Sequence, residues 1–142
     1  MNNATETEFK KVKARQAKGL SPVGLFFHQL VNTSRHSFAG FLYLFKAELA
    51  AKIEAVLFVV VLVIYLVLAV PLSAYLISTV LFLLLLTSEA LNTAVEVIID
   101  HISPEISPTG KHAKDLGSFA VVCTLAANAI FFFWVLFTHL PV

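Results

Sequence analysis

The chain carries no Asp, Glu, Lys or Arg between Glu54 and Glu89, and one proline, Pro71, divides this interval. As a helix, the stretch before Pro71 is long enough to bridge most of the hydrocarbon layer of a bilayer. The stretch after Pro71 provides a second apolar segment. A third charge-free segment follows near the C-terminal end. These patterns predict an all-α membrane protein with three transmembrane helices, at about 55–70, 72–102 and 116–140.

The composition supports a membrane protein and argues against a soluble domain. Of the 142 residues, 58% are hydrophobic and 13% are charged, and the mean hydropathy is +0.86. A soluble domain of this length needs a more polar surface. Cys123 is the only cysteine, so an intrachain disulfide is excluded. The net charge of +1 gives no reason to expect a nucleic-acid partner.

The basic residues predict the orientation in the membrane. All ten lysines and arginines precede the first predicted span or lie between the second and the third. The positive-inside rule places those segments in the cytoplasm, so we expect a cytoplasmic N-terminus and a C-terminus outside. Residues 1–20 read as a basic extension, and residues 21–142 as one membrane domain. Its first part, about 21–53, has the apolar spacing of an amphipathic surface helix.

A polar stripe ends the second predicted span. At 100° per residue its members fall within about 60° of one another on the helix; they are Glu89, Asn92, Glu96 and Asp100. Carboxylates beside lipid are costly, which makes a functional site the default hypothesis. Counting residues places further polar groups at the same level, namely Glu48, Glu54, Lys114 and Asp115. Carboxylates with a nearby lysine suit Mg²⁺ and phosphate, although interhelical ion pairs explain the stripe equally well.

Two motifs carry a family resemblance. E-A-L-N-T-A-V-E-V-I-I-D at 89–100, followed by A-K-D-L-G-S at 113–118, resembles the signature of the small bacterial integral-membrane diacylglycerol kinases. E-L-A-A-K-I-E at 48–54 is similar to that family's acidic motif. The resemblance extends from about Ser34 to the end of the chain. It implies an ATP- and Mg²⁺-dependent lipid kinase of the bacterial inner membrane, assembled as a homotrimer with active sites shared between subunits.

The resemblance also implies a role for each matching residue. Glu89 resembles the general base that acts on the lipid hydroxyl, Asn92 the residue that orients the reacting groups, and Lys114 the one that holds the transferring phosphate. The implied metal ligands are Glu48 and Glu96. The residues implied to bind ATP are Glu48, Glu96, Glu105, Lys114 and Asp115. Those implied to contact the lipid are Glu54, Glu89 and Ser118. Asp100 is implied as a supporting residue.

Two alternatives stay open beside phosphorylation of diacylglycerol to phosphatidic acid. Undecaprenol kinases share the same scaffold, although Glu54, where they often carry a non-acidic residue, favours diacylglycerol. The alternative from a different class is a non-catalytic membrane scaffold or ion-conducting oligomer, in which the stripe serves only to hold the helices together.

Overall fold

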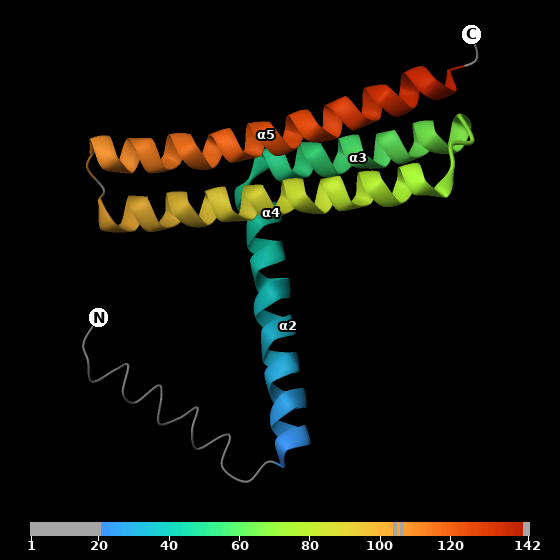
Figure 1. The fold of residues 1–142 in the computed structure, drawn as a ribbon. Helices are drawn as coiled ribbons and strands as arrows, with labels where there is room; N and C mark the ends of the chain where they lie inside the picture. The colour runs from blue at the N-terminus through green and yellow to red at the C-terminus, as the bar shows by residue number, and fades with distance from the viewer. Residues whose placement is uncertain (1–20, 104, 106, 141–142) are drawn as a thin grey trace, which may run out of the picture. The chain divides into compact units, whose positions relative to one another are not determined.

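The described part of the chain is all-helical, as the sequence predicts. The computed structural model describes residues 21–103, 105 and 107–140. These residues form four helices and no strand (Figure 1). Three of the helices are long and apolar enough to cross a membrane. The all-α class and the three candidate spans are thereby confirmed. The expected basic extension, residues 1–20, lies outside the described residues.

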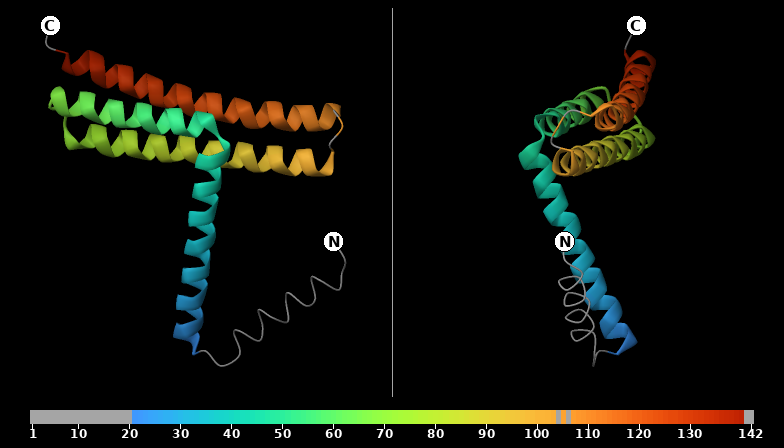
Figure 2. Two further views of the ribbon diagram at one scale, coloured as in Figure 1. Left: turned by 180° about the vertical axis from the view of Figure 1, so that it is seen from behind. Right: turned by 90° about the vertical axis from the view of Figure 1, so that its left-hand side faces the viewer.

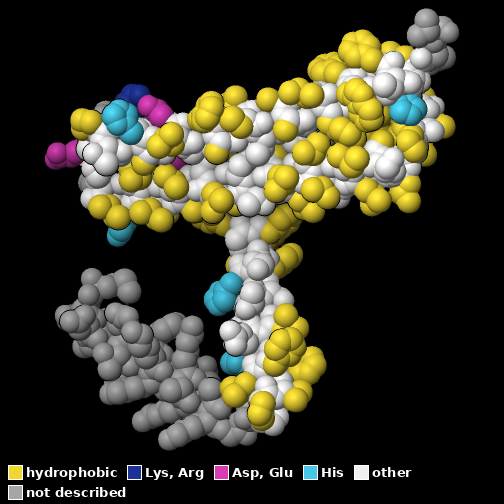
Figure 3. Space-filling model, in the orientation of Figure 1, with side chains coloured by type: hydrophobic (Ala, Val, Ile, Leu, Met, Phe, Trp, Pro, Cys, Tyr) yellow, Lys and Arg dark blue, Asp and Glu magenta, His cyan; other side chains and the backbone are white. Residues whose placement is uncertain are grey.

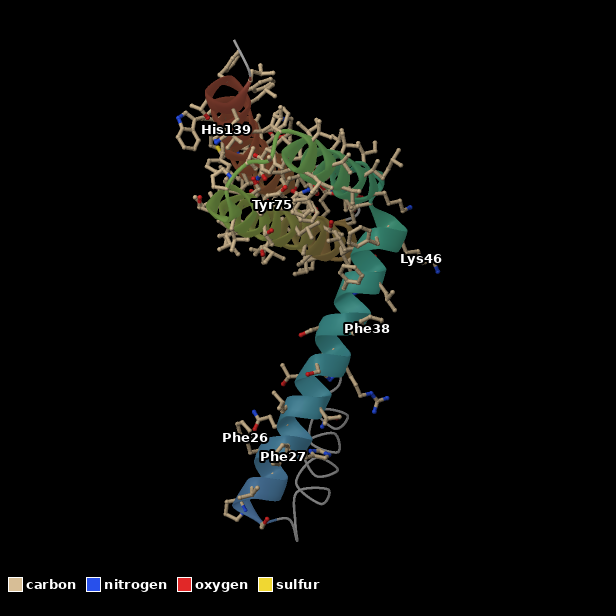
Figure 4. All side chains as sticks on the ribbon, turned by 90° about the vertical axis from the view of Figure 1, so that its right-hand side faces the viewer. Phe26, Phe27, Phe38, Lys46, Tyr75 and His139 are labelled. Atoms are coloured by element: carbon tan, nitrogen blue, oxygen red, sulfur yellow. The ribbon has the colours of Figure 1, made fainter. Side chains whose placement is uncertain are left out.

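The four helices are α2 (Pro22–Ala47), α3 (Leu49–Val67), α4 (Leu72–Ile102) and α5 (Pro108–His139). The described chain divides after Gly40 into two units, which are treated separately below. The first unit contains α2 up to Gly40. The Ser21 hydroxyl accepts a hydrogen bond from the Gly24 backbone at 3.2 Å and caps this helix. Its aromatic side chains are exposed, including Phe26 and Phe27 (Figure 4), whose rings meet edge to face at 5.8 Å.

The second unit contains the last turns of α2 and a bundle of three antiparallel helices. Both views in Figure 2 show α3, α4 and α5 side by side, and α5 packs mainly against α4. A short turn, Leu68–Pro71, joins α3 to α4. Within it Ala69 adopts a φ of 50°, and the backbone N–H of Val70 donates to the Tyr65 carbonyl at 3.2 Å. The turn therefore reverses the chain within four residues.

The buried core of the bundle lies beside this turn. Tyr65 and Val135 are fully buried and pack with Val70 and Ala74. The Tyr65 hydroxyl accepts a hydrogen bond from Ser78 at 3.1 Å, so the polar group of this buried ring is satisfied, as burial demands. Tyr75, labelled in Figure 4, meets the Tyr65 ring edge to face at 5.6 Å. These contacts join all three helices at the end opposite the α4–α5 connection.

Most of the apolar surface of the bundle stays exposed. Of the most hydropathic 18-residue window in each helix, only 17% is buried for α3, 22% for α4 and 6% for α5. In the space-filling view, hydrophobic side chains cover the bundle, and charged ones gather at the end with the α4–α5 connection (Figure 3). Helices that are hydrophobic on nearly all sides belong in lipid or against other apolar helices.

Two helix boundaries differ from those read off the hydropathy. Glu48 has an extended backbone (φ −100°, ψ 121°) and separates α2 from α3, so residues 49–53 belong to the first apolar helix. At the other end, α5 begins at Pro108, ahead of its apolar stretch. Ser107 caps it by accepting a hydrogen bond from the Gly110 backbone at 3.1 Å. A capped start with proline at the first position allows the helix to begin in polar sequence.

Candidate active site

Four carboxyl groups come together beside the start of α3, at the level of α4 that contains Glu89. Glu89 on α4 is 5% exposed and Glu54 on α3 is 9% exposed. The two carboxyl groups face each other closely enough to interact directly. The charges of Glu48 and Glu96 also act on Glu89. The structure thus brings Glu89 together with three other carboxylates of the predicted site, in a setting that excludes most water.

A threonine links this cluster to the break between α2 and α3. Thr93 is 5% exposed, and its hydroxyl donates to Glu48 Oε1 at 3.1 Å. The contact holds the Glu48 side chain against α4. Thr93 was not among the residues predicted from the sequence, yet it follows Glu89 by four positions and so shares its helical face. That spacing was the available signal.

Asn92 occupies the contact between α4 and α5. Its Nδ2 donates to Glu96 Oε1 at 2.9 Å, while its Oδ1 is buried and has no hydrogen-bond partner among the described residues. Gly117 of α5 lies directly against it, and a Cβ at that position would collide with Asn92 Oδ1. The glycine therefore permits a close helix approach that fixes the amide. The unsatisfied oxygen is a costly feature that a bound donor or cation would relieve.

A second polar group of residues lies further along α4, at the start of α5. Lys114 donates to Asp100 Oδ1 at 2.5 Å, and Lys111 donates to Asp115 Oδ2 at 2.6 Å. They border a cavity of about 230 Å³ that is also lined by Glu105, Ser107 and Gly110. Both lysines are paired with carboxylates and Glu105 adds a third acidic group, while the backbone N–H groups at the start of α5 are what favours an anion here. Lys111 was not among the site residues predicted from the sequence, although its spacing of four from Asp115 indicates an ion pair on one helix face.

The predicted residues therefore fall into two groups and one outlier. The carboxylate cluster contains Glu48, Glu54, Glu89 and Glu96, with Asn92 beside it. The polar cavity contains Asp100, Glu105, Lys114 and Asp115. Ser118 is exposed on α5 and belongs to neither group. A purely structural explanation of the stripe predicts interhelical ion pairs and hydrogen bonds, and two are present: Asp100 pairs with Lys114 of α5, and Glu89 interacts with Glu54 of α3.

The carboxylates fit magnesium only together with a substrate. Among the described residues no group of three or more His, Cys, Asp or Glu side chains forms a metal site. Magnesium, however, commonly uses one or two carboxylates and completes its shell with water and phosphate oxygens. Glu48 and Glu96 supply two carboxylates close enough for their charges to act on Glu89, and the unsatisfied Asn92 Oδ1 is a further oxygen donor. The donor set is hard, as Mg²⁺ requires.

Three apolar helices of membrane length around a cluster of carboxylates, two of them buried, define a small helical membrane protein with a candidate catalytic site. Comparison with known proteins identifies it further. Residues 35–136 match the family model described as prokaryotic diacylglycerol kinase. The chain is 32% identical over 102 residues to a diacylglycerol kinase of Pseudomonas aeruginosa, covering 72% of this chain and 83% of that one. It is 30% identical over 108 residues to one from Haemophilus influenzae, covering 76% and 92%.

A shorter match has a higher sequence identity. Over 50 residues the chain is 58% identical to a diacylglycerol kinase of Sinorhizobium sp, which covers 35% of this chain and 36% of that relative. The chain belongs to the prokaryotic diacylglycerol kinase family, as its motifs predicted, and it is an enzyme of that family. The carboxylate cluster and the polar cavity both lie within the matched range.

Proposed function

We propose that the protein transfers the γ-phosphoryl group of ATP to the primary hydroxyl of diacylglycerol and forms phosphatidic acid. One observation carries the proposal: buried Glu89 stands among three other carboxylates, and a cavity with two lysines lies about three turns, roughly 15 Å, further along α4. A proton acceptor next to a polyanion site is what phosphoryl transfer to an alcohol requires. The relatives are diacylglycerol kinases, which suggests diacylglycerol as the acceptor.

In the proposed reaction, Glu89 acts on the acceptor hydroxyl. The hydroxyl oxygen attacks the γ-phosphorus while its proton passes to the Glu89 carboxylate. The bond from the γ-phosphorus to the bridging oxygen breaks, and ADP leaves with that electron pair. Asn92, held by Glu96 on one side and Gly117 on the other, orients the reacting groups. Burial of Glu89 excludes the water that would otherwise compete as acceptor.

The remaining residues divide between nucleotide and lipid. Glu48 and Glu96 would hold Mg²⁺, which neutralises phosphate oxygens when bound. The nucleotide phosphates would contact Lys114 in the cavity that Glu105 and Asp115 also line, and Glu48 and Glu96 would serve ATP binding as the residues that hold the cation. Glu54 and Ser118 are proposed to contact the lipid beside Glu89.

The proposed setting is the bacterial inner membrane, with the carboxylate cluster at the cytoplasmic interface. The N-terminus would be cytoplasmic and the C-terminus outside, because the basic residues precede the first span or lie between the second and third. Residues 1–20 would be an extension to a single membrane domain, 21–142, that begins with a surface helix. The exposed apolar faces of α3, α4 and α5 support a homotrimer whose neighbouring subunits complete one another's sites.

A lipid-dependent kinase assay tests the proposal. Purified protein in vesicles would receive labelled ATP and Mg²⁺ with either diacylglycerol or undecaprenol. Label is expected in phosphatidic acid, and omission of the lipid should abolish it. Exclusive labelling of undecaprenol would replace diacylglycerol as the acceptor. If the protein consumes no ATP with either lipid, the non-catalytic scaffold or channel becomes the better explanation.

Replacing Asp100 by asparagine should affect nucleotide binding more than stability. The carboxylate pairs with Lys114 but is 65% exposed, so losing it should cost less than about 1 kcal/mol of unfolding free energy. Without Asp100 the Lys114 ammonium loses the partner that fixes its position, and we expect this loss of positioning to raise the KM for ATP about three- to tenfold, with kcat changed less. Steady-state kinetics against ATP measure both. A large fall in kcat with unchanged KM would instead place Asp100 in the chemical step.

A further inference from the structure

The hydroxyl of Thr93 is used differently from the hydroxyls of Thr79, Thr87 and Thr138. Those three donate to a carbonyl one turn back in their own helix, at 2.8 Å in each case. This is the usual bond of a threonine hydroxyl inside a helix. Thr93 is 5% exposed, and its hydroxyl donates instead to Glu48 Oε1 at 3.1 Å. Because a hydroxyl has only one proton to donate, this buried side chain is committed to a carboxylate outside α4.

The Glu48 side chain depends on this bond for its position. Glu48 precedes the first residue of α3 with an extended backbone, and its carboxylate does not cap that helix. The residue is half-buried, and within the described residues its carboxylate makes one hydrogen bond, the one from Thr93. Glutamate has a long side chain with many rotamers. Without the hydroxyl, the carboxylate would be free to turn away from α4.

Thr93 lies on the polar stripe of α4, between two of its carboxylates. It follows Glu89 by four positions and precedes Glu96 by three. These spacings place the three side chains on one helix face. The charges of Glu48 and Glu96 both act on Glu89. The bond from Thr93 therefore brings the Glu48 carboxylate to the face that carries the proposed general base and the other proposed metal ligand.

We propose that Thr93 is a positioning residue for the metal site, because its hydroxyl fixes Glu48 against α4, where Glu48 and Glu96 together can hold Mg²⁺. The inference rests on the proposed function, which assigns these two glutamates to the metal. The hydroxyl occupies Oε1 and leaves Oε2 without a hydrogen bond among the described residues. A partner that orients a ligating carboxylate typically contributes about ten- to hundredfold in metal affinity.

Two substitutions separate the hydroxyl from the shape of the side chain. Thr93→Val removes the hydroxyl and keeps the branched shape, whereas Thr93→Ser keeps the hydroxyl. Full-length protein in vesicles would be titrated with the Mn²⁺ complex of a non-hydrolysable ATP analogue, since Mn²⁺ prefers the same hard ligands as Mg²⁺. The relaxation of water protons reports the bound complex without turnover. We expect its dissociation constant to rise about tenfold or more in Thr93→Val and to stay within about threefold of wild type in Thr93→Ser.

The matched control is Thr87→Val. It removes a hydroxyl from the same helix, where Thr87 is exposed and donates to the Leu83 carbonyl. The affinity for the Mn²⁺ complex should remain that of wild type. Size-exclusion chromatography checks that the variants assemble. If Thr93→Val does not assemble, Thr93→Ala makes the same comparison with less bulk.

The Mg²⁺ dependence of lipid phosphorylation gives a second readout. Thr93→Val should raise the apparent KM for Mg²⁺ about tenfold or more, and turnover at saturating Mg²⁺ should fall less. Lower turnover with unchanged affinity for the Mn²⁺ complex would make Thr93 a packing contact and overturn the proposal. A serine variant as weak as the valine variant would overturn it as well, as would a wild-type protein that binds no complex. If the variants rank as expected but no lipid is phosphorylated, the proposed reaction fails and the role of Thr93 stands.

Discussion

Glu89→Gln is expected to lower the rate of lipid phosphorylation by about two orders of magnitude or more, the range for loss of a general base. Glutamine keeps the size and hydrogen-bonding capacity of the side chain but cannot accept the hydroxyl proton. Because Glu89 is buried among three other carboxylates, removing its charge should not weaken the bundle. The kinase assay with saturating ATP and diacylglycerol measures the rate, and thermal unfolding in detergent measures stability.

The neighbouring residue provides the control. Ser88 hydrogen-bonds Thr124 at 2.7 Å between α4 and α5 and lies outside the carboxylate cluster. Ser88→Ala should cost about 1 kcal/mol of stability and keep most of the activity. Glu89→Gln should therefore lose activity and keep its stability, whereas Ser88→Ala should lose some stability and keep most of its activity. An active Glu89→Gln protein would show that Glu89 only packs the helices, as the scaffold alternative requires.

Gly117→Ala should lower activity by up to about a hundredfold, the effect of displacing a positioned group by an ångström. The added methyl group would occupy the space of Asn92 Oδ1 and also lie 3.2 Å from Asn92 Cγ. The amide must rotate, which breaks its hydrogen bond to Glu96, or α5 must move away from α4. Either change should also cost about 1–3 kcal/mol of unfolding free energy.

Two further variants isolate this clash from the general effect of alanine in a helix. Gly40→Ala adds a methyl group on α2 where nothing lies within 4 Å, so it should be neutral or stabilise by about 0.5–1 kcal/mol. The double variant Gly117→Ala with Asn92→Ala should recover stability, because the collision is gone, but not activity. Recovery of activity in the double variant would mean that Asn92 has no part in the reaction.

The sequence predicted the features that depend on local periodicity. Charge-free stretches required membrane-length helices, because a bilayer leaves few other ways to satisfy the backbone. The spacing of Glu89, Asn92 and Glu96 placed them on one face, and the structure finds them there. The family motifs led to the same stretch of α4. These predictions succeeded because each concerns neighbours along one helix.

Contacts between helices were not predictable in the same way. The hydrogen bond from Thr93 to Glu48 joins residues far apart in the chain, and no periodicity signals it. The approach of Gly117 to Asn92 depends on how α5 settles on α4. Likewise, the extended backbone at Glu48, which ends α2 before the expected position, lies within a continuous helical pattern. Such features depend on how the helices pack in three dimensions, which a single sequence does not show.

The turn between α3 and α4 has a consequence for how the protein is made. Four residues, none of them charged, connect the two helices. Because this connection is so short and apolar, one helix cannot cross the bilayer while the other remains in water on the far side. The pair must enter together as a helical hairpin led by the turn. Glu54, near the start of α3, and Glu89, at the matching level of α4, would then stay on the side of entry. Biogenesis itself would therefore bring the two carboxylates face to face before α5 arrives.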